Sequence, residues 1–302
     1  MNPRKRSPSI LDILLLLAII GLGSYFCYRL FFSLNYRWNW SIIPTYLFRF
    51  DPDSGHWTGN ILLEGLLITL KLSAWGTLLA ILLGFGIGLM RVSSRLLWKL
   101  LGRTYIEVIR NTPPLVLVFI FYYFISDQLL DLIGIEDLFR EAPESIQPWL
   151  SLFLAEPSMI KPFLSGTLTL ALFQGAYIAE IVRAGIQAID KGQWESAKAL
   201  GLTRWKSLRL VIMPQALKIM LPPLANEFIN TIKWSSIVSI ISIQELTFQG
   251  MQVIASTQAT IEVWLTVSLM YLLICFSLSL AVRRLEYIVN RSGHTPPPAT
   301  KC

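Results

Sequence analysis

Six long apolar stretches constrain this chain more than any other feature of its sequence. A helix needs about 20 residues to cross the roughly 30 Å hydrocarbon core of a bilayer, and it satisfies its own backbone hydrogen bonds there. Hydrophobic residues make up 54% of the chain and charged residues 15%, which argues against a soluble domain. The sequence therefore predicts an all-α integral membrane protein. The predicted spans are 10–32, 61–90, 105–126, 162–182, 222–243 and 262–282.

The first span has some features of a secretory signal peptide, because the basic run 4–6 precedes its apolar core. That core is long, however, and Tyr25, Tyr28 and Arg29 stand where a small-residue cleavage site is expected. We therefore expect a retained transmembrane helix.

The distribution of basic residues predicts how the chain is oriented, because short basic loops tend to stay in the cytoplasm. Segment 91–104 carries four cations and no acid, and segment 183–221 carries seven cations and two acids. Segment 127–161 carries seven acids and two cations, and Arg283 and Arg284 follow the last span. With six spans and both termini in the cytoplasm, every basic segment lies in the cytoplasm and the acidic segment 127–161 lies outside. This topology accounts for the net charge of +7, so we expect no nucleic-acid partner.

Neither a metal nor a nucleotide site is predicted. Cys27 and Cys275 lie in apolar spans and Cys302 is terminal, so the cysteines show neither metal-ligand spacing nor a disulfide pair. The chain lacks the Gly-x-x-x-x-Gly-Lys-Ser/Thr loop that cradles nucleotide phosphates. We expect no cofactor on this chain and no enzymatic activity of its own.

A short helix is predicted in the basic segment between the fourth and fifth spans. Asp190 or Gly192 can begin it, and Gly201 can end it, because the residue after a helix often needs a positive φ. Thr203 is placed to cap a second amphipathic helix that runs to Val211.

On the first of these helices, Trp194, Ala197 and Leu200 recur at helical spacing and form a small apolar face beside Glu195 and Lys198. Such a face could lie in a groove of another protein. It could equally belong to an interfacial helix that lies on the bilayer.

Five sequence segments narrow these alternatives. They are Arg110–Leu115, Ala179–Ile186, Gly192–Leu202, Met213–Ala216 and Leu221–Asn226. Together and in this order, they resemble the signature of polar amino acid ABC transporter permeases. The resemblance covers roughly residues 60–286 and implies the type I ABC importer permease fold, with about six transmembrane helices and a cytoplasmic coupling helix. Residues 1–59 then form an N-terminal segment with an additional helix, and the proline-rich tail 287–302 is expected to be disordered.

The same resemblance implies a role for the short helix. In this family it belongs to the EAA loop, whose glutamate, alanine and glycine correspond to Glu195, Ala197 and Gly201, and it is gripped by a cytoplasmic ATPase. The implied coupling residues are Trp194, Glu195, Ser196, Ala197, Leu200, Gly201 and Leu202.

The partners implied by the family are two ABC ATPase subunits that hold ATP and Mg²⁺, a second permease chain in a homodimer or a heterodimer, and an external solute-binding protein. The substrate is an amino acid, and the location is the bacterial cytoplasmic (inner) membrane. An ion-driven secondary transporter remains the alternative from another class, although the chain shows neither a convincing inverted repeat nor acid-rich central spans. A membrane scaffold without transport activity is a third possibility.

Polar side chains inside the spans are candidates for a substrate path, because they are costly in hydrocarbon. Asn226, Asn230 and Lys233 follow an i, i+4, i+7 pattern and share a helix face. A lysine there could attract the carboxylate of an amino acid, or it could form a structural ion pair. The fourth span contributes Gln174 and Tyr177.

Ser235 and Ser236 complete the candidate path and could offer neutral hydrogen bonds. The run Lys233-Trp234-Ser235-Ser236 departs from the family, which often has aspartate or asparagine where Trp234 stands.

Two further spacings predict packing. Gly84 and Gly88 form a Gly-x-x-x-Gly pair that permits close helix contact. Arg183 lies three residues after Glu180 and is expected to pair with it.

Overall fold

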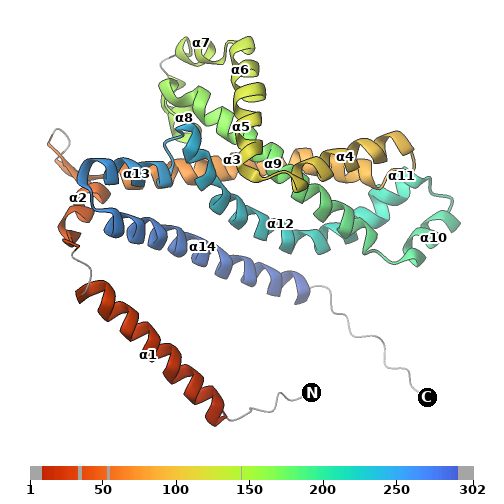
Figure 1. Ribbon diagram of the computed structural model, residues 1–302. Helices are drawn as coiled ribbons and strands as arrows, with labels where there is room; N and C mark the ends of the chain where they lie inside the picture. Colours follow the sequence, from red (N-terminus) through yellow and green to blue (C-terminus); the bar gives the residue numbers. More distant parts are fainter. Residues whose placement is uncertain (1–8, 33–35, 53–54, 144, 292–302) are drawn as a thin grey trace. The chain divides into compact units, whose positions relative to one another are not determined.

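The computed structural model describes residues 9–32, 36–52, 55–143 and 145–291 (Figure 1). The chain divides into two compact units, Met1–Trp40 and Ser41–Cys302. The first contains helix α1 (Ile10–Phe32), which coincides with the first predicted span. Residues 41–59 belong to the second unit, whereas we expected the N-terminal segment to extend to residue 59.

The second unit is helical apart from one antiparallel hairpin, a small departure from the all-α prediction. The hairpin pairs β1 (Phe48–Asp51) with β2 (His56–Gly59). The helices before the fourth predicted span are α2 (Ile43–Leu47), α3 (Ile61–Arg91), α4 (Leu96–Asn111), α5 (Pro114–Ile120), α6 (Asp127–Ile133), α7 (Ile135–Arg140) and α8 (Gln147–Phe153). The later helices are α9 (Ile160–Gln187), α10 (Lys191–Ala199), α11 (Arg204–Ser207), α12 (Met213–Ser235), α13 (Leu246–Thr257) and α14 (Thr260–Arg291).

Shorter helical turns connect some of these elements. Two are π-helical, Phe121–Ser126 after α5 and Leu208–Ile212 after α11. Three are 3₁₀ turns: Trp40–Ile42, Pro157–Met159 and Ser236–Ile241.

All six predicted apolar stretches contain helices. Among the described residues, four helical segments are both long and apolar enough to cross a membrane: Ile61–Val92, Pro114–Ile133, Arg204–Ile241 and Thr260–Arg284. Helix α9 is 28 residues long but more polar. It is surrounded by other helices, so fewer of its side chains need to be compatible with lipid.

The third and fifth spans begin at different residues from those predicted. Thr112 is extended (φ −102°, ψ 137°) because Pro113 follows it, so α4 ends at Asn111 and a new helix begins at Pro114. Residues 105–111 therefore belong to α4, and most of the predicted loop 91–104 is helical.

In the fifth span, Pro222 and Pro223 lie inside α12 rather than at its start. The predicted second amphipathic helix, Thr203 to Val211, is not separate, because it continues through a π-helical turn into α12. At the other end of the unit, α14 extends to Arg291, beyond the expected boundary at residue 286. The tail 287–302 was predicted to be disordered, but its residues 287–291 are the last part of α14, and 292–302 lie outside the described residues.

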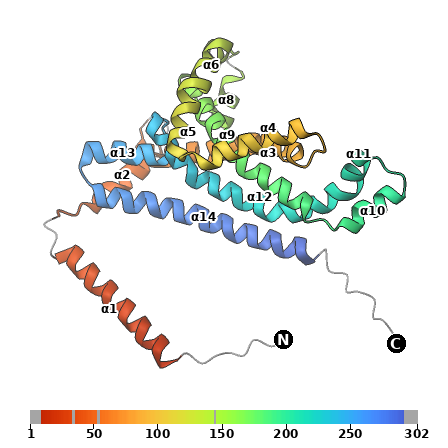
Figure 2. The same ribbon diagram turned by 45° about the vertical axis from the view of Figure 1, so that its right-hand side comes forward.

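Helices α3 and α9 pack along most of their length, and α12 packs against both (Figures 1 and 2). The predicted glycine pair lies in this contact. A Cβ added at Gly84 would lie 2.7 Å from Ile178 Cβ, and one added at Gly88 would lie 2.6 Å from Val182 Cβ. These glycines let the two backbones approach each other closely, which confirms the packing prediction.

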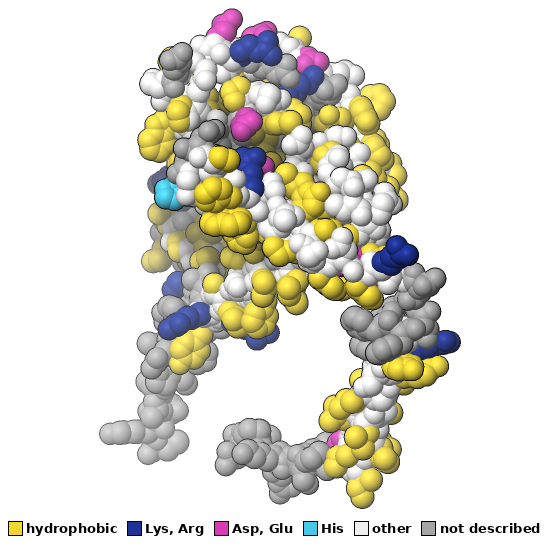
Figure 3. Space-filling model, turned by 90° about the vertical axis from the view of Figure 1, so that its left-hand side faces the viewer, with side chains coloured by type: hydrophobic (Ala, Val, Ile, Leu, Met, Phe, Trp, Pro, Cys, Tyr) yellow, Lys and Arg dark blue, Asp and Glu magenta, His cyan; other side chains and the backbone are white. Residues whose placement is uncertain are grey.

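Helices α6, α7 and α8 project from one side of this bundle, within the predicted external segment 127–161 (Figure 1). Lys71 Nζ of α3 donates to the carbonyl oxygen of Ser151 at 2.7 Å, and Trp75 Nε1 donates to that of Phe153 at 2.8 Å. Lys161 pairs with Asp131 at 2.6 Å. Acidic and basic side chains gather at this end, while hydrophobic side chains cover much of the face below it (Figure 3).

The glycine contact leads to a stability prediction. Replacing Gly84 with alanine should lower the free energy of unfolding by about 1–3 kcal/mol, because the new methyl group would collide with the Ile178 branch point and with the carbonyl oxygen of Gly175. Gly86→Ala is the control, since nothing lies within 4 Å of a Cβ at that position. The thermal midpoint of each purified variant in one detergent measures the effect. Equal midpoints would contradict the assigned contact.

Candidate functional site

Helix α10 and the turn after it form the predicted coupling segment, residues 190–203. The Asp190 side chain accepts a hydrogen bond from the amide of Gly192 at 2.6 Å, so Asp190 is the N-cap. At the other end, Gly201 has φ +76°, as predicted for the residue that ends the helix. The amides of Gly201 and Leu202 donate to the carbonyl oxygens of Lys198 and Ala197, at 2.9 and 3.1 Å. This pair of bonds is a Schellman motif, which needs a left-handed residue at Gly201.

The predicted apolar face of α10 is split between the protein interior and the solvent. Ala197 is buried, and half-buried Trp194 packs against a core cluster that includes Ile186 of α9 and Ile212. Leu200, by contrast, is 81% exposed. Trp194 and Ala197 therefore attach the helix to its own chain.

The remaining predicted coupling residues form the accessible side of the segment. Glu195, Ser196 and Gly201 are exposed with Leu200, and Leu202 is partly buried. A partner could therefore contact the second half of α10 and the glycine turn without disturbing the core.

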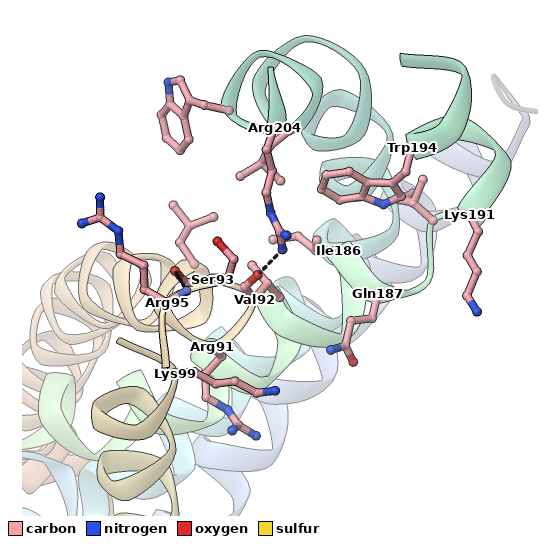
Figure 4. A pocket seen from close by; sticks show the side chains of 15 residues that line it. Arg91, Val92, Ser93, Arg95, Lys99, Ile186, Gln187, Lys191, Trp194 and Arg204 are labelled. Atoms are coloured by element: carbon pink, nitrogen blue, oxygen red, sulfur yellow. Dashed lines mark hydrogen bonds between the residues drawn. The ribbon is translucent and has the colours of Figure 1, made fainter. Parts of the chain in front are cut away.

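Arg204 fastens the coupling segment to α3. Thr203 caps α11 by accepting a hydrogen bond from the amide of Lys206 at 3.4 Å, and Arg204 follows it. Arg204 Nη2 donates to the carbonyl oxygen of Val92, just beyond α3, at 3.0 Å (Figure 4). Sequence reasoning did not find this contact, because the two residues are far apart in the chain.

The candidate substrate-path residues do not all meet. Gln174 is fully buried between α9 and α12, and its amide lies 3.0 Å from Thr231 Oγ1. When this amide is turned so that its nitrogen faces Glu227, it donates to Oε1 at 3.1 Å. Asn230 Nδ2 donates to the other carboxylate oxygen of Glu227, also at 3.1 Å. Two of the predicted residues thus meet around one carboxylate.

Sequence reasoning did not single out Glu227 or Thr231. An acid within an apolar stretch was a usable signal for Glu227, because such residues are rarely present without a role or a partner. For Thr231 the sequence offered no comparable signal, since threonine often bonds to its own helix, as Thr231 does to the Glu227 carbonyl oxygen at 2.9 Å.

Among the described residues, the other predicted path residues make no hydrogen bond or ion pair with the Glu227 carboxylate. Asn226 and Lys233 are exposed. Ser235 and Ser236 donate to the carbonyl oxygens of Ile232 and Lys233, at 2.8 and 2.7 Å, within their own helical segment. These two hydroxyl groups are therefore already engaged.

Further along α9, Tyr177 and Glu180 each have a basic partner. The half-buried Tyr177 ring lies 5.6 Å below the Arg110 guanidinium, a cation–π contact. The predicted Glu180–Arg183 pair is confirmed, with Arg183 Nε donating to Glu180 Oε1 at 2.9 Å.

Comparison with known proteins decides the family. Residues 76–291 match the family described as the binding-protein-dependent transport system inner membrane component. The chain belongs to this family. The permease is 35% identical over 226 residues to the glutamine transport system permease protein of Escherichia coli (strain K12), covering 75% of this chain and 91% of that one. It is 34% identical over 239 residues to the octopine transport system permease protein of Rhizobium radiobacter, covering 79% and 89%.

Solved structures show the same relationship. An amino acid ABC transporter crystallised with histidines matches the permease with a TM-score of 0.60 at 35% identity, covering 75% of this chain and 93% of that one. An inward-facing MetNI methionine ABC transporter matches with a TM-score of 0.57 at 16% identity, which supports the fold alone. The permease therefore has the type I ABC importer fold. It is a multi-pass inner-membrane subunit, and ATP hydrolysis belongs to a separate ATPase subunit.

The burial of Ala197 generates a prediction for the coupling segment. Ala197→Leu should loosen α10 from the core, because the larger side chain does not fit the buried site, at a cost of about 1–3 kcal/mol. Ala199→Leu places the same side chain at an exposed position of the same helix and is the control. Limited trypsin digestion in native membranes should cleave the Ala197 variant faster near Lys191 and Lys198. Unchanged cleavage in both variants would refute the docking of this face.

Proposed function

We propose that the permease forms the membrane path of an ATP-driven importer of amino acids. Its substrates would be polar amino acids, either acidic or neutral ones or a broad range. Similarity to the glutamine and octopine permeases supports the substrate class. The observation that carries the proposal is the division of α10 into two sides. On one side Trp194 packs on the core and Ala197 is buried, while Glu195, Ser196, Leu200 and Gly201 lie open to a partner.

The proposed orientation places α10 and both termini in the cytoplasm. The charge distribution supports it, since the segment 183–221 is basic and the segment 127–161 is acidic. In this orientation α6, α7 and α8 face the external solute-binding protein, and α10 faces the ATPase.

The assembly that we propose contains two permease chains, identical or related, above two ABC ATPase subunits that bind ATP and Mg²⁺. Closure of the ATPases would bring the two α10 helices together. Because Trp194 and Ala197 pack on the core and Arg204 bonds to Val92, that motion would be transmitted to α9, α12 and α3. The binding protein would bias the same equilibrium through unequal affinity for the inward-open and outward-open states.

For the substrate path we propose the cluster around Glu227, with Gln174 and Asn230 beside it. Lys233 lies within electrostatic range of the Glu227 carboxylate. An amino acid carries one ammonium and one carboxylate group, so these two side chains offer a complementary charge for each. Asn230 would supply a neutral hydrogen bond.

The other candidate path residues have smaller roles in this proposal. Tyr177 and Asn226 would border the path, and Ser235 and Ser236 would shape the end of α12, because their hydroxyl groups are already bonded within the helix.

Reconstitution tests the proposal against an ion-driven carrier. The chain is purified with its co-purifying proteins, which mass spectrometry identifies, and is placed in proteoliposomes with the binding protein. Uptake of labelled glutamine should require ATP inside the vesicles and persist without an ion gradient. Uptake by the permease alone under an ion gradient would favour a secondary transporter.

The glycine turn generates a prediction for coupling. Gly201→Asp should abolish solute-stimulated ATP hydrolysis, because it puts a charge and extra volume where the ATPase is proposed to dock. The fold should survive, since nothing lies within 4 Å of a Cβ at Gly201 and aspartate tolerates positive φ better than most residues.

Gly201→Asn is the matched control for the backbone, being similar in shape but uncharged. Both variants should insert at wild-type levels with similar melting points. Normal stimulated hydrolysis in the aspartate variant would exclude the coupling role of this turn.

The polar cluster generates a second prediction. Asn230→Ala should raise the KM for amino acid uptake by about two- to tenfold, because it removes the hydrogen bond that Asn230 is proposed to offer the substrate, worth about 0.5–1.5 kcal/mol. Ser277→Ala is the control, since Ser277 Oγ donates to the Leu273 carbonyl oxygen of its own helix and its side chain is exposed on α14. Initial uptake rates over a range of substrate concentrations give the KM of each variant. An unchanged KM in the Asn230 variant would remove this residue from the path.

A further inference from the structure

A cavity of about 700 Å³ lies between the end of α3, the start of α4 and the coupling segment (Figure 4). Its volume falls in the range of small-molecule sites. It opens beside α10, at the end of the permease that the basic segments assign to the cytoplasmic membrane surface. Trp194 and Arg204, which attach the coupling segment, line part of it, but neither the coupling surface nor the substrate path includes the space itself.

The lining of the cavity is strongly cationic. It includes five basic side chains and no carboxylate: Arg91, Arg95, Lys99, Lys191 and Arg204. Three come from the end of α3 and the start of α4, one from α10 and one from α11. Like charges gathered around one space repel one another, and an anion in that space would relieve the repulsion.

Most of these cations have spare hydrogen-bonding capacity. Among the described residues, no hydrogen bond or ion pair engages the side chains of Arg95, Lys99 or Lys191, and Arg91 Nε is buried without a partner. Glu180 lies within electrostatic range of Arg91, but Arg183 already engages it. In Figure 4 Lys191 points away from the other cations, and the Arg95 side chain lies apart from Arg91 and Lys99, so the case depends on four cations at different parts of one cavity.

The α4 surface beside these cations is apolar and exposed. Leu96 is 69% exposed, Leu97 66% and Leu100 49%. They are close in sequence to Arg95 and Lys99, at the start of α4. Trp205, another lining residue, is 62% exposed, and tryptophan is typical of the membrane–water interface.

A cationic cavity next to an exposed leucine surface matches both parts of a phospholipid. We propose that this cavity binds the phosphodiester headgroup of an anionic phospholipid from the cytoplasmic leaflet, with its acyl chains along Leu96, Leu97 and Leu100. Basic pockets between helices on this side of a membrane are suited to such headgroups. The bound lipid would bridge α3 and α4 to the coupling segment, because Arg91 and Arg95 lie on one side of the cavity and Arg204 on the other.

Free inorganic phosphate or a phosphate ester shares the headgroup chemistry but lacks the chains. The exposed leucines favour the lipid. Binding of a chain-free phosphate with equal affinity would therefore show that the leucine surface contributes nothing.

Native mass spectrometry of the intact transporter in a mild detergent tests the proposal. The probes are dioctanoyl phosphatidylglycerol, dioctanoyl phosphatidylcholine and glycerol 3-phosphate, each titrated separately. The pocket variant is Arg95→Gln/Lys99→Gln, and the matched control is Lys206→Gln/Lys218→Gln. The control removes the same charge from exposed sites outside the cavity. All four side chains are exposed, so neither variant removes a buried contact.

We expect the wild type and the control to bind phosphatidylglycerol roughly tenfold more tightly than phosphatidylcholine, and the pocket variant to lose most of that preference. Glycerol 3-phosphate should neither bind comparably nor displace the lipid. The single variants Arg95→Gln and Lys99→Gln should each lose part of the preference, which keeps the test valid if the double variant folds poorly.

Three results would overturn the proposal. The first is an unchanged preference in the pocket variants, which would place lipid binding elsewhere. The second is an equal loss in the control, which would show a general charge effect. The third is binding of glycerol 3-phosphate as tight as that of the lipid, which would assign the cavity to a soluble phosphate compound.

Discussion

The close contact between α3 and α9 determines where the rest of the permease lies. Gly84 and Gly88 bring the α3 backbone against Ile178 and Val182, with no room for even one methyl group. Since α9 leads directly into α10, this contact also sets the position of the coupling segment. Helix association in a bilayer gains little from the hydrophobic effect, because lipid tails are as apolar as leucine. Close packing of small residues therefore has to supply the specificity.

The coupling segment combines local rigidity with a firm attachment. Its ends are defined by the Asp190 cap and the Gly201 turn, so its shape does not depend on a partner. Its inner side is held by Ala197, and Arg204 ties the chain beyond it to Val92. A force applied to the exposed side of such an element moves the helices behind it, as an importer driven by a separate ATPase requires. The proposed lipid site lies across the same junction.

The buried carboxylates Glu227 and Glu245 both have hydrogen-bond partners inside the permease. Glu227 is buried yet contacts amide groups of Gln174 and Asn230, which offsets the cost of placing a carboxylate among helices. Glu245 is likewise buried and accepts hydrogen bonds from Tyr271 and from the amide of Phe248, which fixes the start of α13. The first cluster lies between α9 and α12, where a path is proposed, whereas the second has an evident structural role.

The sequence alone determined the features that depend on local chemistry. The length of the apolar stretches located the apolar helices, and the need for a positive φ placed the end of α10 at Gly201. The five sequence motifs, in their order along the chain, identified the family. Only the tertiary structure decided which side chains meet, because contacts such as Arg204 with Val92 and Gln174 with Glu227 join distant parts of the chain. It also decided that Trp194 and Ala197 face inward, since a helical pattern shows which residues share a face but not what that face packs against.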